Sequence, residues 1–219
     1  MGTRGSAGII YQEKEKLGYN QFDSYPDGLG RRMLEIIAKI NNENGWEKFK
    51  NNFAQLKNID GSNEITDLEI IEKYSKYANL NVSEQKLSDP YCLFRKIQGY
   101  GWIDEVYKGY LQDYPFDNEF IYNSLSCEYA YIINLDTMKL EFYTGFQKVS
   151  QNGNRFGEEK RDNYYPCRLV GVFNLLEIFD TELVEKMNNI IETGKDDSSV
   201  NTYFRKPKLD MINEKSLIE

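Results

Sequence analysis

The segment CEYAYIINLDTMKLEFYTG at residues 127–145 indicates a β-hairpin and decides the fold class. Residues 129–133 are apolar at every position, so this first strand is expected to be covered on both faces. The stretch LDTM at 135–138 predicts a turn, after which the alternation of apolar and polar residues resumes with Leu140 and Phe142. Two neighbouring strands joined by so short a turn must run antiparallel.

Two further regions extend this sheet. Residues 3–22 predict a second hairpin around the polar sequence QEKEK at 12–16, and residues 168–173 predict another strand. Apolar residues at helical spacing, together with turn and capping residues, predict helices at 29–40, 46–56, 66–77, 90–97, 103–111 and 181–192. We therefore expect an α+β fold in which an antiparallel sheet packs against helices.

Length and composition favour one domain. The chain has 219 residues, of which 40% are apolar, enough for one large core and short for two full domains. We place that domain at residues 1–194. From Lys195 onward the sequence is polar with few residues that could anchor it, so residues 195–219 are expected to form a mobile tail.

The charge balance limits the partners. The chain carries 27 basic and 35 acidic residues, a net charge of −8, and such a field repels phosphate backbones and anionic lipid surfaces. Duplex nucleic acid and membranes are therefore not expected as partners. No apolar run approaches the length of a membrane span, and the start does not read as a signal peptide. Three widely spaced cysteines predict free, buried thiols in a reducing compartment, hence a cytoplasmic protein.

The absence of histidine removes several classes of chemistry. With no histidine in the chain, Ser-His-Asp and Cys-His catalysis, histidine-ligated zinc and imidazole acid–base chemistry are excluded. The cysteines form no CxxC pair, and no other pattern predicts a metal site or a cofactor. An enzyme with this sequence would have to use carboxylates, tyrosine, lysine, a cysteine thiolate or a hard metal held by oxygen ligands.

The most distinctive local feature is the turn between the first hairpin and the first helix, residues 22–32. Exposed amides at a positive helix end can hold an anion, and paired carboxylates can move a proton. Aspartate, proline and glycine are equally what a tight strand-to-helix turn requires, so a structural role stays open. The candidate ligand-binding residues are Arg4, Asp23, Tyr25, Asp27, Gly28, Gly30 and Arg31, of which Asp23 and Asp27 are the candidate catalytic residues.

The opening MGTRG, followed by YNQFDSYPDGLG at 19–30, resembles a family of uncharacterised proteins found in bacteriophages and low-GC bacteria. The stretches EYAYIINLDTMKLEFYTG (128–145) and YYPCRLVGVF (164–173) are similar to sheet segments of that family, which implies no activity. The order of strand, hairpin and Asp-containing turn also resembles the start of N-terminal-nucleophile hydrolases and class II amidotransferases. Those enzymes need Cys, Ser or Thr as the first mature residue, whereas removal of Met1 here exposes Gly2.

Three functions follow as hypotheses. The first is a non-catalytic accessory protein of a phage or mobile element that binds a host protein or a small anionic ligand. The second is a hydrolase that uses the carboxylates of the 22–32 turn, with Arg4 or Arg31 stabilising developing negative charge. The third is a virion or assembly component whose tyrosine-rich surface forms an oligomer interface. The sequence favours a binding protein over an enzyme.

Overall fold

Strands β5 (Tyr129–Asn134) and β6 (Lys139–Thr144) form the predicted hairpin within a five-stranded sheet. The predicted amino-terminal hairpin consists of β1 (Gly5–Tyr11) and β2 (Lys14–Asn20), and β7 (Arg168–Asn174) completes the sheet. The strands follow the order β2-β1-β5-β6-β7. Both hairpins, the strand at 168–173 and the α+β class are therefore confirmed.

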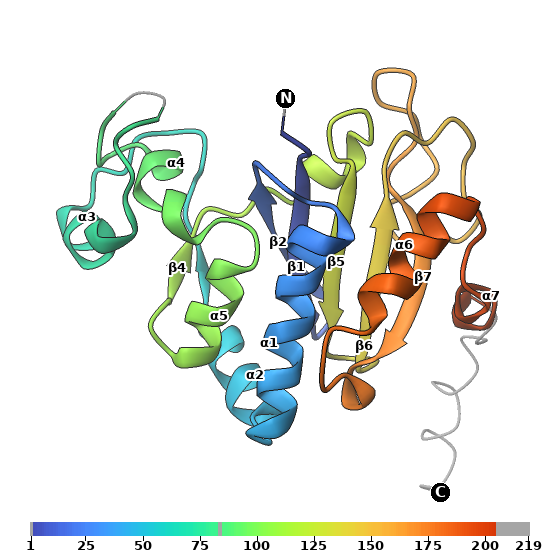
Figure 1. Cartoon of the computed structure of the whole chain (residues 1–219). Helices are drawn as coiled ribbons and strands as arrows, with labels where there is room; N and C mark the ends of the chain where they lie inside the picture. Colours follow the sequence, from blue (N-terminus) through green and yellow to red (C-terminus); the bar gives the residue numbers. More distant parts are fainter. Residues whose placement is uncertain (1, 83–84, 205–219) are drawn as a thin grey trace, which may run out of the picture.

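The computed structural model describes residues 2–82 and 85–204 and is shown in Figure 1. The helices are α1 (Arg31–Asn42), α2 (Trp46–Ala54), α3 (Leu68–Tyr74), α4 (Pro90–Leu93), α5 (Gly101–Lys108), α6 (Leu183–Thr193) and α7 (Ser198–Phe204). Single helical turns are η1 (Pro26–Gly30), η2 (Ser75–Tyr77), η3 (Arg95–Ile97), η4 (Phe120–Tyr122) and η5 (Leu175–Glu177). Every helix in this part of the chain is too short or too polar to cross a lipid bilayer.

One strand pair differs from the predicted antiparallel arrangement. Strand β1 pairs with β5 in parallel, with Gly5 opposite Tyr129, while the other three pairs are antiparallel. Parallel neighbours need a long crossover, and the helical region between β2 and β5 provides it. Within that region β3 (Lys57–Asn58) and β4 (Asp113–Tyr114) form a separate parallel pair.

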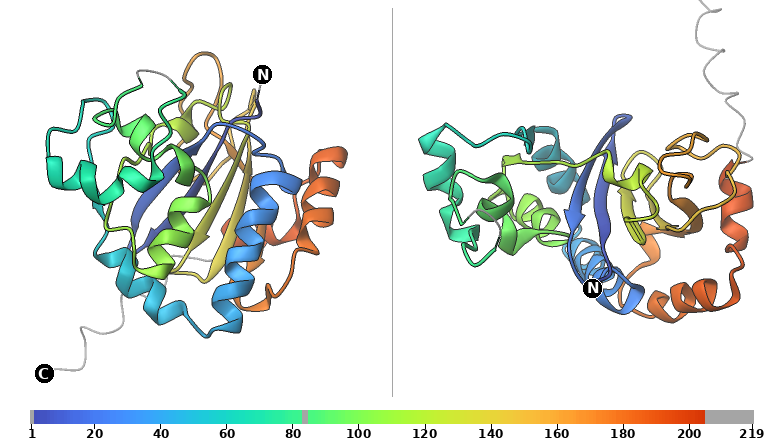
Figure 2. Two further views of the ribbon diagram at one scale, coloured as in Figure 1. Left: turned by 60° about the vertical axis from the view of Figure 1, so that its left-hand side comes forward. Right: turned by 90° about the horizontal axis from the view of Figure 1, so that it is seen from above.

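Each face of the sheet is covered by a different part of the chain. Helices α1 and α6 lie on one face, and the segment 146–167 lies over the other (Figure 2). Tyr131 and Ile133 belong to the larger apolar cluster on the helical side, whereas Ala130 and Ile132 belong to the smaller cluster on the loop side. This explains why β5 is apolar at successive positions, as the sequence predicted.

The outward-facing backbone groups of the two outermost strands are bonded within the chain. On β2, the Leu17 carbonyl accepts a hydrogen bond from the Asp117 N–H at 2.8 Å, and the Leu17 N–H donates to the Asn118 side chain at 2.8 Å. On β7, the Val170 carbonyl accepts from the Asp197 N–H at 2.8 Å. Segments outside the sheet therefore occupy the outer side of both strands.

The carboxy-terminal segment departs from the predicted mobile tail at 195–219. Residues 198–204 form α7, which contacts β7, and Val200 is buried in the loop-side cluster. The Ser199 hydroxyl accepts a hydrogen bond from the Val172 N–H at 3.2 Å. The polar composition of this segment predicted a mobile tail. One buried apolar side chain, Val200, and a few hydrogen bonds are nevertheless enough to hold the two turns of α7 against β7. Residues 205–219 lie outside the described part of the chain.

The three cysteines agree with the prediction. Cys92, Cys127 and Cys167 are all buried and none forms a disulfide. Burial raises the pKa of the Cys127 thiol well above its ordinary value, which keeps it protonated and unreactive at neutral pH.

Candidate ligand-binding site

The predicted turn is held by close backbone contacts. Asp23 adopts a left-handed conformation with φ of 54°, and its carbonyl accepts a hydrogen bond from the Leu29 N–H at 2.8 Å. A side chain at position 28 would place its Cβ 2.0 Å from the Asp23 carbonyl oxygen. Only glycine fits at this close approach. Gly28 therefore has a structural reason to be present.

Asp27 and Arg31 tie the turn to α6. Arg31 donates to Asp27 at 3.2 Å and to the Thr181 hydroxyl at 3.1 Å, and the Asn188 amide donates to Asp27 at 2.7 Å. The hydrogen bond from Asn188, assisted by Arg31, lowers the pKa of the Asp27 carboxyl. Asp27 is consequently ionised and already paired, an arrangement suited to fixing the turn and poorly suited to general-base catalysis.

Most of the predicted residues surround one open hollow of about 440 Å³, namely Asp23, Tyr25, Asp27, Gly28 and Arg31. Gly30 is not part of its lining, because it is buried under the ring of Tyr131. Arg4 lies elsewhere, next to β5, where its N–H donates to the Glu128 carboxylate at 3.2 Å. The turn thus brings both candidate carboxylates to one surface without Arg4.

Replacing Gly28 with alanine is expected to lower the free energy of unfolding by about 1–3 kcal/mol, because the added methyl group forces the Asp23–Leu29 turn apart. Gly61→Ala is the matched control, since a Cβ there meets only Pro115 at 3.5 Å, an ordinary contact. Urea denaturation followed by circular dichroism measures both. Equal stability of the two variants would contradict the tight turn.

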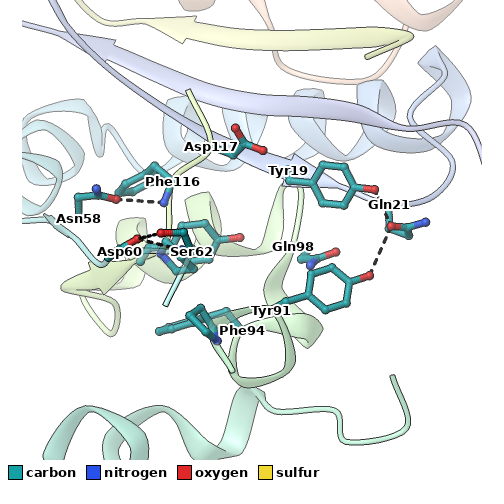
Figure 3. Close-up of a pocket in the computed structure, with 14 residues that line it drawn as sticks. Tyr19, Gln21, Asn58, Asp60, Ser62, Tyr91, Phe94, Gln98, Phe116 and Asp117 are labelled. Carbon is teal, nitrogen blue, oxygen red and sulfur yellow. Dashed lines mark hydrogen bonds between the residues drawn. The ribbon is translucent and has the colours of Figure 1, made fainter. Parts of the chain in front are cut away.

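A larger hollow of about 940 Å³ lies beside β2 (Figure 3). Four segments that are distant in sequence form it: β2, the loop after β3, the α4–η3 region and residues 114–117. Its aromatic lining residues are Tyr19, Tyr91, Phe94, Tyr114 and Phe116, and its polar lining residues are Gln21, Asn58, Asp60, Ser62, Gln98 and Asp117. We call it the aromatic hollow.

Packed rings hold the inner wall of the aromatic hollow. Tyr114 stacks on the buried Trp102 with ring centroids 5.5 Å apart, and it contacts Phe94 and Phe116 at 5.4 and 5.2 Å. The β3–β4 pair places Asn58 next to this wall, where its side-chain oxygen accepts a hydrogen bond from the Phe116 N–H at 3.1 Å. The wall is therefore preformed.

The three side-chain amides of the aromatic hollow are all held through their oxygens. Asn58 accepts from the Phe116 N–H, Gln98 accepts from the Arg95 guanidinium, and Gln21 accepts from the Tyr19 hydroxyl at 2.5 Å. A backbone N–H and a guanidinium can only donate, which fixes the orientation of Asn58 and Gln98. Among the described residues, none accepts a hydrogen bond from the nitrogen of these three amides.

Two carboxylates belong to the lining of the aromatic hollow: Asp60 lies near Asn58 at one end, and Asp117 lies between Phe116 and Tyr19 (Figure 3). Hydrogen bonds from Ser62, and then Asn63, lower the pKa of Asp60 to about 2. Burial raises the pKa of Asp117, against a backbone hydrogen bond from the Phe120 N–H. No lysine or arginine belongs to the described lining, so the hollow carries negative charge.

The opposite end contains Tyr19, Gln21 and Tyr91 (Figure 3). Burial raises the pKa of Tyr19, while the charges of Arg4 and Arg95 act in the opposite direction. The Arg95 guanidinium lies 4.8 Å from the centre of the Tyr91 ring. Arg4, which the sequence placed with the aspartates, thus interacts with Tyr19 of the aromatic hollow and not with the 22–32 turn.

A cluster of polar side chains around the buried Glu141, on the loop side of the sheet, was not predicted from the sequence. Glu141 of β6 is fully buried, and its carboxylate accepts hydrogen bonds from Asn134 at 2.7 Å, Tyr143 at 2.7 Å, Arg155 at 3.0 Å and Tyr203 at 2.5 Å. We call these five residues the Glu141 cluster. Each carboxylate oxygen is already bonded, so the cluster joins β6, the segment 146–167 and α7 instead of binding a ligand.

The comparisons with known proteins give no relative. No protein-family model, curated protein or solved structure matches this chain. The resemblance of residues 1–32 to phage and low-GC bacterial proteins therefore stays a prediction, and function has to be inferred from the geometry of the aromatic hollow.

Proposed function

We propose that this protein is a non-catalytic binding protein that holds a small polar molecule in the aromatic hollow. The observation that carries the proposal is the set of three amides, on Gln21, Asn58 and Gln98, whose oxygens are bonded within the protein and whose N–H groups are not. Oriented donors on an aromatic wall are the usual composition of a small-molecule site. A volume of about 940 Å³ is within the range of such sites.

The chemistry of the aromatic hollow supports binding over catalysis. Ser62 is its one aliphatic hydroxyl, and that hydroxyl donates to Asp60 at 2.6 Å. With a pKa of about 2, Asp60 is too weak a base to activate a serine near neutral pH. A binding protein is also what the sequence favoured, but the proposed site is the aromatic hollow and not the 22–32 turn.

Equilibrium dialysis of the protein against a mixture of cellular small molecules, with mass spectrometry of what it retains, tests this function. We expect at least one compound to be retained by the unmodified protein and by Tyr110→Ala, whose ring is exposed outside the hollow. Tyr91→Ala and Gln98→Ala should each weaken retention by about tenfold, the effect of losing one ring contact or one hydrogen bond.

Two results would contradict the proposal. Retention of the same compounds by all four proteins would place the binding site elsewhere. Retention of no compound by the unmodified protein, with circular dichroism showing it folded, would remove small-molecule binding as its function.

A further inference from the structure

We propose that the ligand of the aromatic hollow is a neutral carbohydrate of more than one sugar unit. This inference rests on the proposed function and adds the chemical class of the ligand. It follows from which ligand can satisfy the polar groups at both ends of the hollow, from the arrangement of the aromatic rings, and from the volume.

The polar groups of the lining disfavour a charged ligand. An anion would face the carboxylates of Asp60 and Asp117 without any lysine or arginine in the described lining. A cation would suit those carboxylates, but the free amide groups of Asn58 and Gln98 are hydrogen-bond donors and offer it no ligand. A hydroxyl group both donates and accepts, so a polyhydroxylated neutral molecule satisfies the carboxylates and the amides together.

The positions of these groups match a molecule with hydroxyls along its length. Figure 3 shows Asn58 and Asp60 at one end, Gln21 and Gln98 at the other, and Asp117 between Phe116 and Tyr19. The apolar faces of a sugar ring can lie on aromatic rings while its hydroxyls point to the polar groups at the rim.

The ring geometry disfavours a flat nucleobase. Phe94 and Tyr114 meet at an interplanar angle of 70°, and Tyr114 and Phe116 meet at 54°. These wall rings therefore form no parallel pair between which a planar base could be sandwiched. The partly exposed rings of the lining, Tyr19, Tyr91 and Phe116, come from three separate segments, which suits the puckered rings of successive sugar units. A volume of about 940 Å³ also exceeds what a single sugar ring fills.

Titration calorimetry against a panel of neutral trisaccharides, with adenosine, uridine, an acidic trisaccharide and an amino trisaccharide as comparison compounds, tests the ligand class. We expect at least one neutral trisaccharide to bind. Its Kd should rise about tenfold in Asn58→Ala, Gln98→Ala and Tyr91→Ala and stay unchanged in Tyr110→Ala. Because the ligand is uncharged, Kd should change less than about twofold between low and high salt.

Each other outcome has a distinct meaning. Binding of a nucleoside or of a charged compound, with no neutral trisaccharide bound, overturns the carbohydrate inference and leaves the proposed function standing. If no panel compound binds but dialysis still retains another molecule in the hollow, the carbohydrate inference is again overturned and the proposed function again stands. Failure of both the panel and the dialysis overturns the inference together with the proposed function.

Discussion

Replacing Glu141 with alanine is expected to lower the free energy of unfolding by about 3 kcal/mol or more. The substitution leaves the Arg155 guanidinium without its carboxylate and removes an acceptor from Asn134, Tyr143 and Tyr203. Buried donors without an acceptor cost about 1–3 kcal/mol each. Urea denaturation followed by circular dichroism gives the value.

Two further variants test the physical reason for this loss. Glu35→Ala removes an exposed pair with Arg32 and should change stability by less than about 1 kcal/mol. Replacing both charges of the buried pair, as Glu141→Leu with Arg155→Met, should recover part of the stability lost in Glu141→Ala, since no unpaired charge remains. If Glu141→Ala were as stable as Glu35→Ala, the cluster would not hold the loop side of the sheet together.

Replacing Trp102 with alanine is expected to cost about 3–5 kcal/mol and to abolish ligand binding in the aromatic hollow. Trp102 is fully buried, stacks on Tyr114 and meets Phe116 edge-on at 5.1 Å. Its Nε1 lies where a Cβ of Gly18 would be only 2.3 Å away, so the indole packs directly on the backbone of β2. Its removal leaves a cavity behind the wall of the hollow.

The indole nitrogen provides a sharper version of this experiment. In the described structure Nε1 of Trp102 has no hydrogen-bond partner, whereas Nε1 of Trp46 donates to Asn41 at 2.7 Å. Trp102→Phe should therefore cost less than Trp46→Phe, because only the latter leaves a buried acceptor unpaired. The chain has 2 tryptophans, so circular dichroism is preferable to fluorescence as the probe. The opposite order would contradict the assignment of the two indoles.

The sheet was predictable because its signal is local. The alternation in 127–145 and the small and apolar residues of β1 specify strands wherever they pack. The parallel pairing of β1 with β5 was not predictable, because an apolar pattern shows that a strand is buried without naming its neighbour. The docking of α7 was missed because a single apolar side chain, Val200, lies in the core.

The candidate site was harder to foresee. The 22–32 turn was located correctly as a tight strand-to-helix connection, but the sequence could not show that Asp27 bonds to α6 and Arg31 to Thr181 just before it. The aromatic hollow draws residues from four separate segments, each of which reads as an ordinary loop or short helix. Only the high aromatic content, 14% of the chain, pointed towards such a wall.

The hydrogen bonds on the outer edges of β2 and β7 have a consequence for association between copies of this protein. Strands with unpaired backbone groups are templates on which other chains aggregate or swap segments. Here Asp117 and Asn118 block one such template, and Asp197 and Ser199 block the other. Helix α7 and the residues just before it thus cover the outer edge of β7. A chain shortened before Asp197 would expose that edge to strand addition by other molecules.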